Sequence, residues 1–454
     1  MTAHTDDPME LASRVVDRAM AAGADVAEVS VGEGRHLTAQ VRLGEKEVLE
    51  EAGSRGLSLR VMRGQQVAVA STSDFREVGL ARVVEDALEL AALSQADPFA
   101  GAPDRELLSE ARQHAELDLH DPRVEAIDGA QALEMAMEAE GAALALDKRI
   151  GNSDGASVTR QAGSSVLVTS GGFKGSQSGT YISIVVNPVA ADGDGKMRAG
   201  YHFNARRHVA DLLEPRAVGE EAAVRTLAKL GARKLETQQM PVIFDPQSGR
   251  AILGLLAGCI TGGAIWRKSS YLAERMGTQV ASPLVSIEDD PLIARAPGSR
   301  AFDGEGLLSR RNTVVDAGQL RCFLLDSYSG RKLEQSSTAS ASRGGGRVGA
   351  STSNFFMKAG ALSPEELVAS TERALYVTEM MGFGFNGVTG DFSRGAAGFL
   401  IEGGKRVHPV SEVTISLNLD DLFARIDAVA NDLDHETAIC TPTFRVSEMT
   451  VAGK

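Results

Sequence analysis

Hydrophobic and polar residues follow two different periods in the first part of the chain. Leu11, Val15 and Ala19 recur every fourth residue between Pro8 and Gly23, which predicts a short amphipathic helix. Apolar and polar residues then alternate in three segments, as expected for strands with one buried face. These segments are residues 37–41, 57–61 and 67–69. Together they predict an antiparallel sheet.

A second helix and a linker follow this sheet. Asp74 is a suitable cap for a stretch in which Leu80 and Val84 share one face, and the helical pattern stops before Pro98. The next residues, up to Pro122, are rich in proline and charge, which is typical of a linker.

The rest of the chain divides into two further units. An alanine-rich helical pattern runs from about Gly129 to Asp147, strand-like segments follow it, and a helical stretch from Arg216 to Leu230 closes the unit. From Pro241 onward, short apolar segments interrupted by glycines predict mostly strands. A chain of 454 residues exceeds the size of a single hydrophobic core. The predicted domains are residues 1–110, 111–236 and 237–454.

Charge and cysteine content narrow the possible partners and the compartment. The net charge of −14 opposes binding to a phosphate backbone, so we expect no nucleic acid as a direct partner. The three cysteines (Cys259, Cys322 and Cys440) are odd in number and widely spaced, which favours a reducing compartment. Residues Met1 to Pro8 show no secretory signal, and the apolar run from Ala251 to Trp266 is shorter than the roughly 20 residues of a membrane-spanning helix. We therefore expect a cytoplasmic protein without a membrane partner.

The sequence lacks the usual metal-binding motif of a zinc peptidase. None of its eight histidines belongs to an HExxH or HExxxH motif. The nearest approach is the segment from His435 to Cys440, in which an imidazole and a thiol flank Glu436. Residues five apart on a regular helix point in different directions, and Pro442 limits any helix here. A distorted turn that brings both side chains onto one metal is one interpretation, and a solvated turn before a final strand is the other.

Other candidate motifs are incomplete. No G-x-S-x-G turn precedes a helix, and the glycine run at residues 344–346 lacks the Lys-Ser/Thr pair of a phosphate-binding loop. Cys259 lies in an apolar run and is expected to be an inert buried thiol. Gly254, Gly258 and Gly262 recur every fourth residue, so a helix would carry them on one face at about 1 kcal/mol each relative to alanine. They favour either close packing within the chain or contact with a second subunit.

Four longer strings of residues carry a family likeness. They are IWRKSS (265–270), FDGEG (302–306), TGDFSRGAAGF (389–399) and PVSEVTI (409–415). Together they resemble the PmbA (TldE) branch of the TldD/PmbA family, and the likeness covers nearly the whole chain. It implies an α+β fold, with a mixed sheet-and-helix N-terminal part followed by a strand-rich C-terminal domain.

The resemblance also implies where a metal site would be and why it is absent. In this family the TldD branch carries an HExxxH helix and a later cysteine as zinc ligands, and the TldE branch lacks the histidines. The motif corresponds to residues 254–259 of this chain, where Gly254 and Cys259 replace the histidines and Leu255 replaces the general base. Cys440 lies in the stretch that resembles the one holding the cysteine ligand. One thiolate without imidazole partners does not make a catalytic site, so we expect no catalytic residue, no metal ligand and no cofactor in this chain.

The function implied by the resemblance is that of a non-catalytic subunit of a heterodimeric zinc metallopeptidase. A TldD-like HExxxH chain would be the partner and would hold the zinc, and the substrates would be unfolded or leader peptides, in proteolysis or peptide maturation. Two other functions stay open: an independent homodimeric metallopeptidase, and a regulatory protein that binds DNA gyrase. The candidate contacts with a peptide, with an ordinary surface loop as the alternative, are Gly344, Gly345, Gly346, Ser353 and Asn354.

Overall fold

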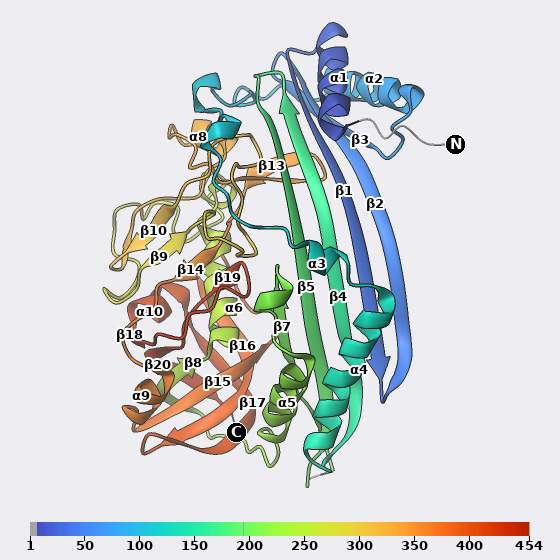
Figure 1. Ribbon diagram of the computed structural model, residues 1–454. Coiled ribbons are helices and arrows are strands. Elements are labelled where there is room, and N and C mark those ends of the chain that lie inside the picture. Colours follow the sequence, from blue (N-terminus) through green and yellow to red (C-terminus); the bar gives the residue numbers. More distant parts are fainter. Residues whose placement is uncertain (1–6, 194, 454) are drawn as a thin grey trace.

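The largest element of the fold is a seven-stranded antiparallel sheet (Figure 1). The computed structural model describes residues 7–193 and 195–453, so most of the segment Met1 to Pro8, predicted to lack a secretory signal, lies outside the described residues. The strand order is β3-β2-β1-β4-β5-β6, and β7 pairs with β5. The strands are β1 (Val26–Arg42), β2 (Glu45–Arg63), β3 (Gln66–Thr72), β4 (Ile150–Thr169), β5 (Lys174–Ala191), β6 (Met197–Ala199) and β7 (His202–Arg206).

Helices cover one face of this sheet at both of its ends. Because side chains alternate along a strand, Val29, Val31, Leu37 and Ala39 of β1 point to the same face. Val29 and Val31 belong to a core with the first two helices, and Leu37 and Ala39 belong to a core with two later helices. These helices lie at opposite ends of the long strands (Figure 1). They are α1 (Pro8–Ala21), α2 (Glu77–Leu93), α4 (Gly129–Leu146) and α5 (Pro215–Leu227), and the short α3 (Pro122–Glu125) lies between α2 and α4 in the chain.

The C-terminal part consists mostly of strands. A six-stranded sheet has the order β17-β16-β15-β8-β20-β18, and an additional pairing of β17 with β20 closes five of its strands into a ring. Its strands are β8 (Gln238–Phe244), β15 (Arg373–Met381), β16 (Asp391–Glu402), β17 (Lys405–Asn418), β18 (Ile426–Val429) and β20 (Phe444–Ala452). A second sheet has the order β11-β10-β9-β14-β19 and consists of β9 (Ile287–Asp289), β10 (Asn312–Asp316), β11 (Gln319–Leu320), β14 (Phe355–Met357) and β19 (Ile439–Cys440).

One hairpin and five helices complete this part of the chain. The hairpin consists of β12 (Ala341–Gly344) and β13 (Arg347–Ala350). The helices are α6 (Pro246–Cys259), α7 (Gly262–Trp266), α8 (Ser327–Lys332), α9 (Pro364–Ala369) and α10 (Leu419–Ala424).

The structure confirms the predicted α+β class. The strands of residues 26–72 and 150–206 share one sheet, and the strands after residue 237 form separate sheets, while the division into three domains stays a prediction. The predicted linker, residues 97–122, contacts the C-terminal part through Ser109, whose backbone N–H donates to the Gly306 carbonyl at 2.9 Å. Among the described residues, no helix combines the length and the apolar character needed to cross a membrane.

Candidate functional site

The helix that corresponds to the family's zinc motif is α6. Asp245 caps it by accepting a hydrogen bond from the Ser248 N–H at 2.7 Å, and Pro246 occupies its first position, where a missing N–H costs nothing. Its apolar side, which includes Ile252 and Leu256, lies in the main core of the C-terminal part. The core therefore fixes one face of α6 and leaves the opposite face open.

The three motif positions of α6 do not converge. Gly254 is partly exposed, and a Cβ at this position would meet only Ile439 Cδ1, at 3.9 Å. Leu255 packs at the edge of the core. The Cys259 thiol points toward the Gly387 carbonyl, 4.0 Å away, and burial raises its pKa to about 11. The structure therefore brings Gly254, but not Cys259, next to the strand of Cys440. The burial and the raised pKa of Cys259 agree with the expectation of an inert thiol.

His435, in the segment before β19, contacts Cys440, the last residue of β19. The distance between Cys440 Sγ and His435 Nδ1 is 3.5 Å, and the imidazole packs edge-on against the ring of Phe356 with the centroids 4.8 Å apart. Burial raises the pKa of the Cys440 thiol to about 12 and lowers the pKa of His435. The thiol is therefore protonated and the imidazole neutral at neutral pH.

This pair does not amount to a zinc site. Glu436 points to the other side, where its carboxylate accepts hydrogen bonds from Asn204 Nδ2 at 2.7 Å and from the Ala205 N–H at 3.0 Å. Within the described parts of the chain, no three His, Cys, Asp or Glu side chains form a group that could hold a metal. Catalytic zinc requires three protein ligands and a deprotonated thiol where cysteine is one of them. The residues near α6 thus do not fit zinc.

The predicted peptide-contact residues occupy two different environments. The run Gly344 to Gly346 forms the turn of the β12–β13 hairpin, and a Cβ on Gly346 would lie 2.5 Å from Val69 Cγ1 of the large sheet. Ser353 and Asn354 are buried, and the Asn354 amide donates to the Asp290 carbonyl at 2.7 Å. Neither Ser353 nor Asn354 has a surface in this structure that a peptide could reach.

A groove runs between α6 and the large sheet. Its walls include Tyr201, Phe203, Arg250 and Ile439, and its volume is about 480 Å³. The Arg250 guanidinium lies 5.0 Å from the centre of the Phe203 ring. Ile439 of the groove wall is also the residue that the Cβ position of Gly254 faces.

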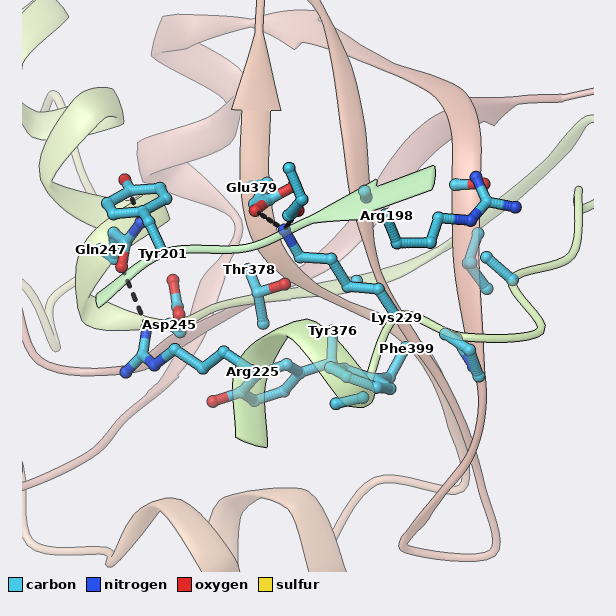
Figure 2. Close-up of a pocket in the computed structure, with 18 of the residues that line it drawn as sticks. Arg198, Tyr201, Arg225, Lys229, Asp245, Gln247, Tyr376, Thr378, Glu379 and Phe399 are labelled. Carbon is cyan, nitrogen blue, oxygen red and sulfur yellow. Dashed lines mark hydrogen bonds and ion pairs between the residues drawn. The ribbon is translucent and has the colours of Figure 1, made fainter. Parts of the chain in front are cut away.

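A second cavity, of about 500 Å³, lies between α5 and the strands β15, β16 and β17 (Figure 2). It shares Tyr201 with the groove. The Arg406 guanidinium lies 4.2 Å from the centre of the Tyr376 ring and 5.4 Å from that of Phe399. Asp245, the cap of α6, also lines this cavity, and burial raises its pKa to about 6.

Sequence reasoning missed this cavity because its walls come from six separate segments between residues 197 and 412. Lys229 of the segment after α5 forms an ion pair with Glu379 of β15 across 150 residues, and Figure 2 shows both side chains at the cavity. One signal was present. Two of the strings that carry the family likeness contribute Phe399 and Pro409 to the wall.

Comparison with known proteins gives a consistent result over the whole chain. Family profiles described as the PmbA/TldA metallopeptidase domain 1, central domain and C-terminal domain match residues 27–91, 122–230 and 237–453. Metalloprotease PmbA of Escherichia coli O157:H7 is 36% identical over 95% of this chain and 93% of that protein. A Metalloprotease PmbA homolog of Haemophilus influenzae is 35% identical over 100% of this chain and 98% of that protein.

Two further similarities concern the fold and a related chain. The crystal structure of TldE from Thermococcus kodakarensis superimposes with a TM-score of 0.86 at 20% identity, covering 98% of this chain and 100% of that chain. A Metalloprotease TldD homolog of Haemophilus influenzae is 28% identical over 257 residues, which is 52% of each chain.

Proposed function

Because the chain belongs to the PmbA/TldD metallopeptidase family, in its PmbA/TldE branch, we propose that it is the non-catalytic subunit of a two-chain zinc peptidase. The observation that carries this proposal is the composition of α6 at the motif positions. Gly254 and Leu255 offer neither an imidazole nor a carboxylate, and Cys259 is turned away toward Gly387. A peptidase of this family then needs a second chain for its zinc.

The partner is a TldD-like chain that carries the HExxxH motif. Haemophilus influenzae has both a PmbA homolog and a TldD homolog that match this sequence, which supports a pairing of the two branches. The open face of α6 supports it as well, since no atom beyond the neighbouring residues and backbone of the helix itself lies within 4 Å of where a Cβ on Gly258 would stand. A partner helix can approach closely at such glycines.

The substrates are unfolded or leader peptides. The groove beside α6 combines apolar walls at Phe203 and Ile439 with one cation, Arg250. An extended chain can lie in such a groove and make main-chain contacts that tolerate many sequences, whereas a folded domain cannot enter it.

Reconstitution tests the proposal. The purified chain alone should hold no stoichiometric zinc by elemental analysis and should not cleave an unfolded casein substrate. Mixed with a TldD-like chain of the same organism, it should elute as a heterodimer that contains zinc and cleaves casein. A partner that is equally active without this chain, or the failure of any heterodimer to form, would overturn the proposal.

An independent homodimeric metallopeptidase is the second candidate, and it rests on the contact between His435 and Cys440. Two chains would together offer two imidazoles and two thiolates, the number of donors in a tetrahedral zinc site. Zinc in the isolated chain that is lost in His435→Ala would favour this candidate. The high pKa of the Cys440 thiol opposes it, because the metal binds the thiolate.

A further inference from the structure

The cavity of about 500 Å³ next to α5 has the construction of a binding site. Strand pairing is interrupted on all three strands that form its floor. The β15–β16 ladder shifts register between Val377 and Glu379, and the β16–β17 ladder shifts register between Ala396 and Gly398, opposite the segment of β17 in which Glu412 has a positive φ of 57°. Bulges re-aim side chains and end pairing, and they are frequent beside functional sites. Two bulges therefore lie side by side in the floor of the cavity.

One edge of β15 is free at the same level. The parallel pairing of β15 with β8 includes only Leu375 to Val377, because β8 ends at Phe244 and the chain continues into the cap of α6. The Asp245 N–H donates to the Val377 carbonyl at 3.2 Å as the last bond on this side. In the described chain, the backbone from Thr378 onward therefore has no strand partner on its cavity side.

Two charged groups in the cavity, Arg406 and Asp245, form no ion pair with any described residue, although burial, the larger effect, raises the pKa of Asp245 and the positive charge of Arg406 lowers it. Arg406 stacks on the rings of Tyr376 and Phe399, and no carboxylate of the described residues forms an ion pair with it. Asp245 is 7% exposed and accepts its side-chain hydrogen bonds, both from Ser248, at the same oxygen, Oδ1. One guanidinium and one carboxylate oxygen are thus available to a ligand.

The remaining charges in the lining balance one another. Lys229 pairs with Glu379, and the Arg225 side chain bonds to Glu221 at 2.8 Å. A ligand with several negative charges would meet these carboxylates as well as the cations, so a nucleotide or polyphosphate does not fit. A zwitterion with an apolar body does, because it presents one anion and one cation between aromatic and aliphatic walls.

We propose that this cavity binds a short peptide of two or three residues with free ends, its carboxylate on Arg406 and its ammonium on Asp245. The volume lies in the range of small-ligand sites. The free edge of β15 can bond to the backbone of the peptide, and Tyr376 and Phe399 can contact its side chains. The inference does not rest on the proposed function, because binding is a property of this chain alone.

Calorimetric titration of the full chain with the tripeptide Ala-Ala-Leu above pH 7 tests the proposal. We expect saturable binding that weakens at least tenfold when the C-terminus of the probe is amidated. Arg406→Gln should weaken binding of Ala-Ala-Leu by a similar factor. This variant should bind the tripeptide with a free C-terminus and the tripeptide with an amidated C-terminus equally well. Arg406 is exposed, so this variant keeps its fold.

Matched variants separate the site from general effects. Lys405→Gln removes a neighbouring exposed cation outside the cavity lining and should leave the affinity unchanged. Asp245→Asn keeps a capping side chain for α6 and should lose the preference for a free N-terminus over an N-acetylated probe. No saturable binding of Ala-Ala-Leu, or equal affinity in wild type and Arg406→Gln, would overturn the proposal. A failed reconstitution with the TldD-like chain would leave it intact.

Discussion

Replacement of Gly262 by alanine should destabilise the protein because this glycine is in close contact with α8. A Cβ on Gly262 would lie 2.3 Å from Ser329 Cβ and 2.9 Å from Leu325 Cδ2. Ser329 is 3% exposed, and its Cβ cannot move without its backbone. Overpacking of this kind costs about 1–3 kcal/mol. Gly262→Ala should therefore lower the free energy of unfolding by that amount.

The same substitution at Gly254 should have the opposite effect. A Cβ there would meet only Ile439 Cδ1, at the ordinary contact distance of 3.9 Å. Gly254 lies in the interior of α6, where alanine is favoured over glycine by about 1 kcal/mol. Gly254→Ala should raise the free energy of unfolding by up to about 1 kcal/mol, and the two variants should differ by about 1–4 kcal/mol.

Fluorescence of Trp266 during urea unfolding can measure this difference. Trp266 is the single tryptophan of the chain, it lies at the end of α7, and its ring is 5.9 Å from that of Tyr328 on α8. Its signal therefore reports on the contact between these helices. The urea midpoint should fall in Gly262→Ala and rise in Gly254→Ala. A wild-type midpoint for Gly262→Ala, or a less stable Gly254→Ala, would refute the packing argument.

Three further predictions concern a buried acid, a thiol and the open face of α6. Burial raises the pKa of Glu305 from 4.5 to about 7, so the folded protein binds this proton more tightly than the unfolded chain does. The free energy of unfolding therefore falls as the pH rises from about 4.5 to about 7. In urea unfolding, the free energy of unfolding of Glu305→Gln should exceed that of the wild type by up to about 3 kcal/mol at pH 8 and by little at pH 4. Equal differences at both pH values would contradict this. Cys440→Ala should leave zinc content and peptide turnover of the reconstituted pair unchanged, because its buried thiol stays protonated, and a loss of zinc from the folded variant would place Cys440 in a shared site. Gly258→Leu should fold normally, since its Cβ position is open, but should weaken the heterodimer in size-exclusion chromatography, and unchanged assembly would place the partner elsewhere.

The sequence predicts elements whose residues are close in the chain better than contacts between distant segments. The spacing of Leu11, Val15 and Ala19 predicts a helix, and these residues form the buried face of α1. The spacing of Gly254, Gly258 and Gly262 puts the three on one face only if one helix includes them all, and the structure has two helices here, with Gly262 in the second. The helix α6 ends at Cys259 because the chain bonds to another segment there, with the Gly262 N–H donating to the Leu324 carbonyl at 2.7 Å. A tertiary hydrogen bond of this kind has no local signal.

The candidate sites show the same limit. The absence of an HExxxH motif is visible in the sequence alone, because the motif depends only on local spacing. The burial of Asn354 was not visible, because its partners Asp290 and Ser299 are more than 50 residues away. A polar residue in a glycine- and serine-rich segment resembles a surface loop until the tertiary contacts are known.

The residues of α6 that pack into the core and the residues that are open to solvent lie on opposite sides of the helix. Ile252 and Leu256 hold the helix in the core, while Gly254 and Gly258 lie on its open side. Asp245 fixes its first turn through the cap to Ser248, at the wall of the cavity. A helix of 14 residues is a rigid rod of about 20 Å, so these positions keep their relative places whichever side chains the open face carries. Substitutions at Gly254 and Gly258 can therefore change the exposed surface of α6 without disturbing the core contacts of Ile252 and Leu256, whereas a substitution at Cys259 would act inside the core.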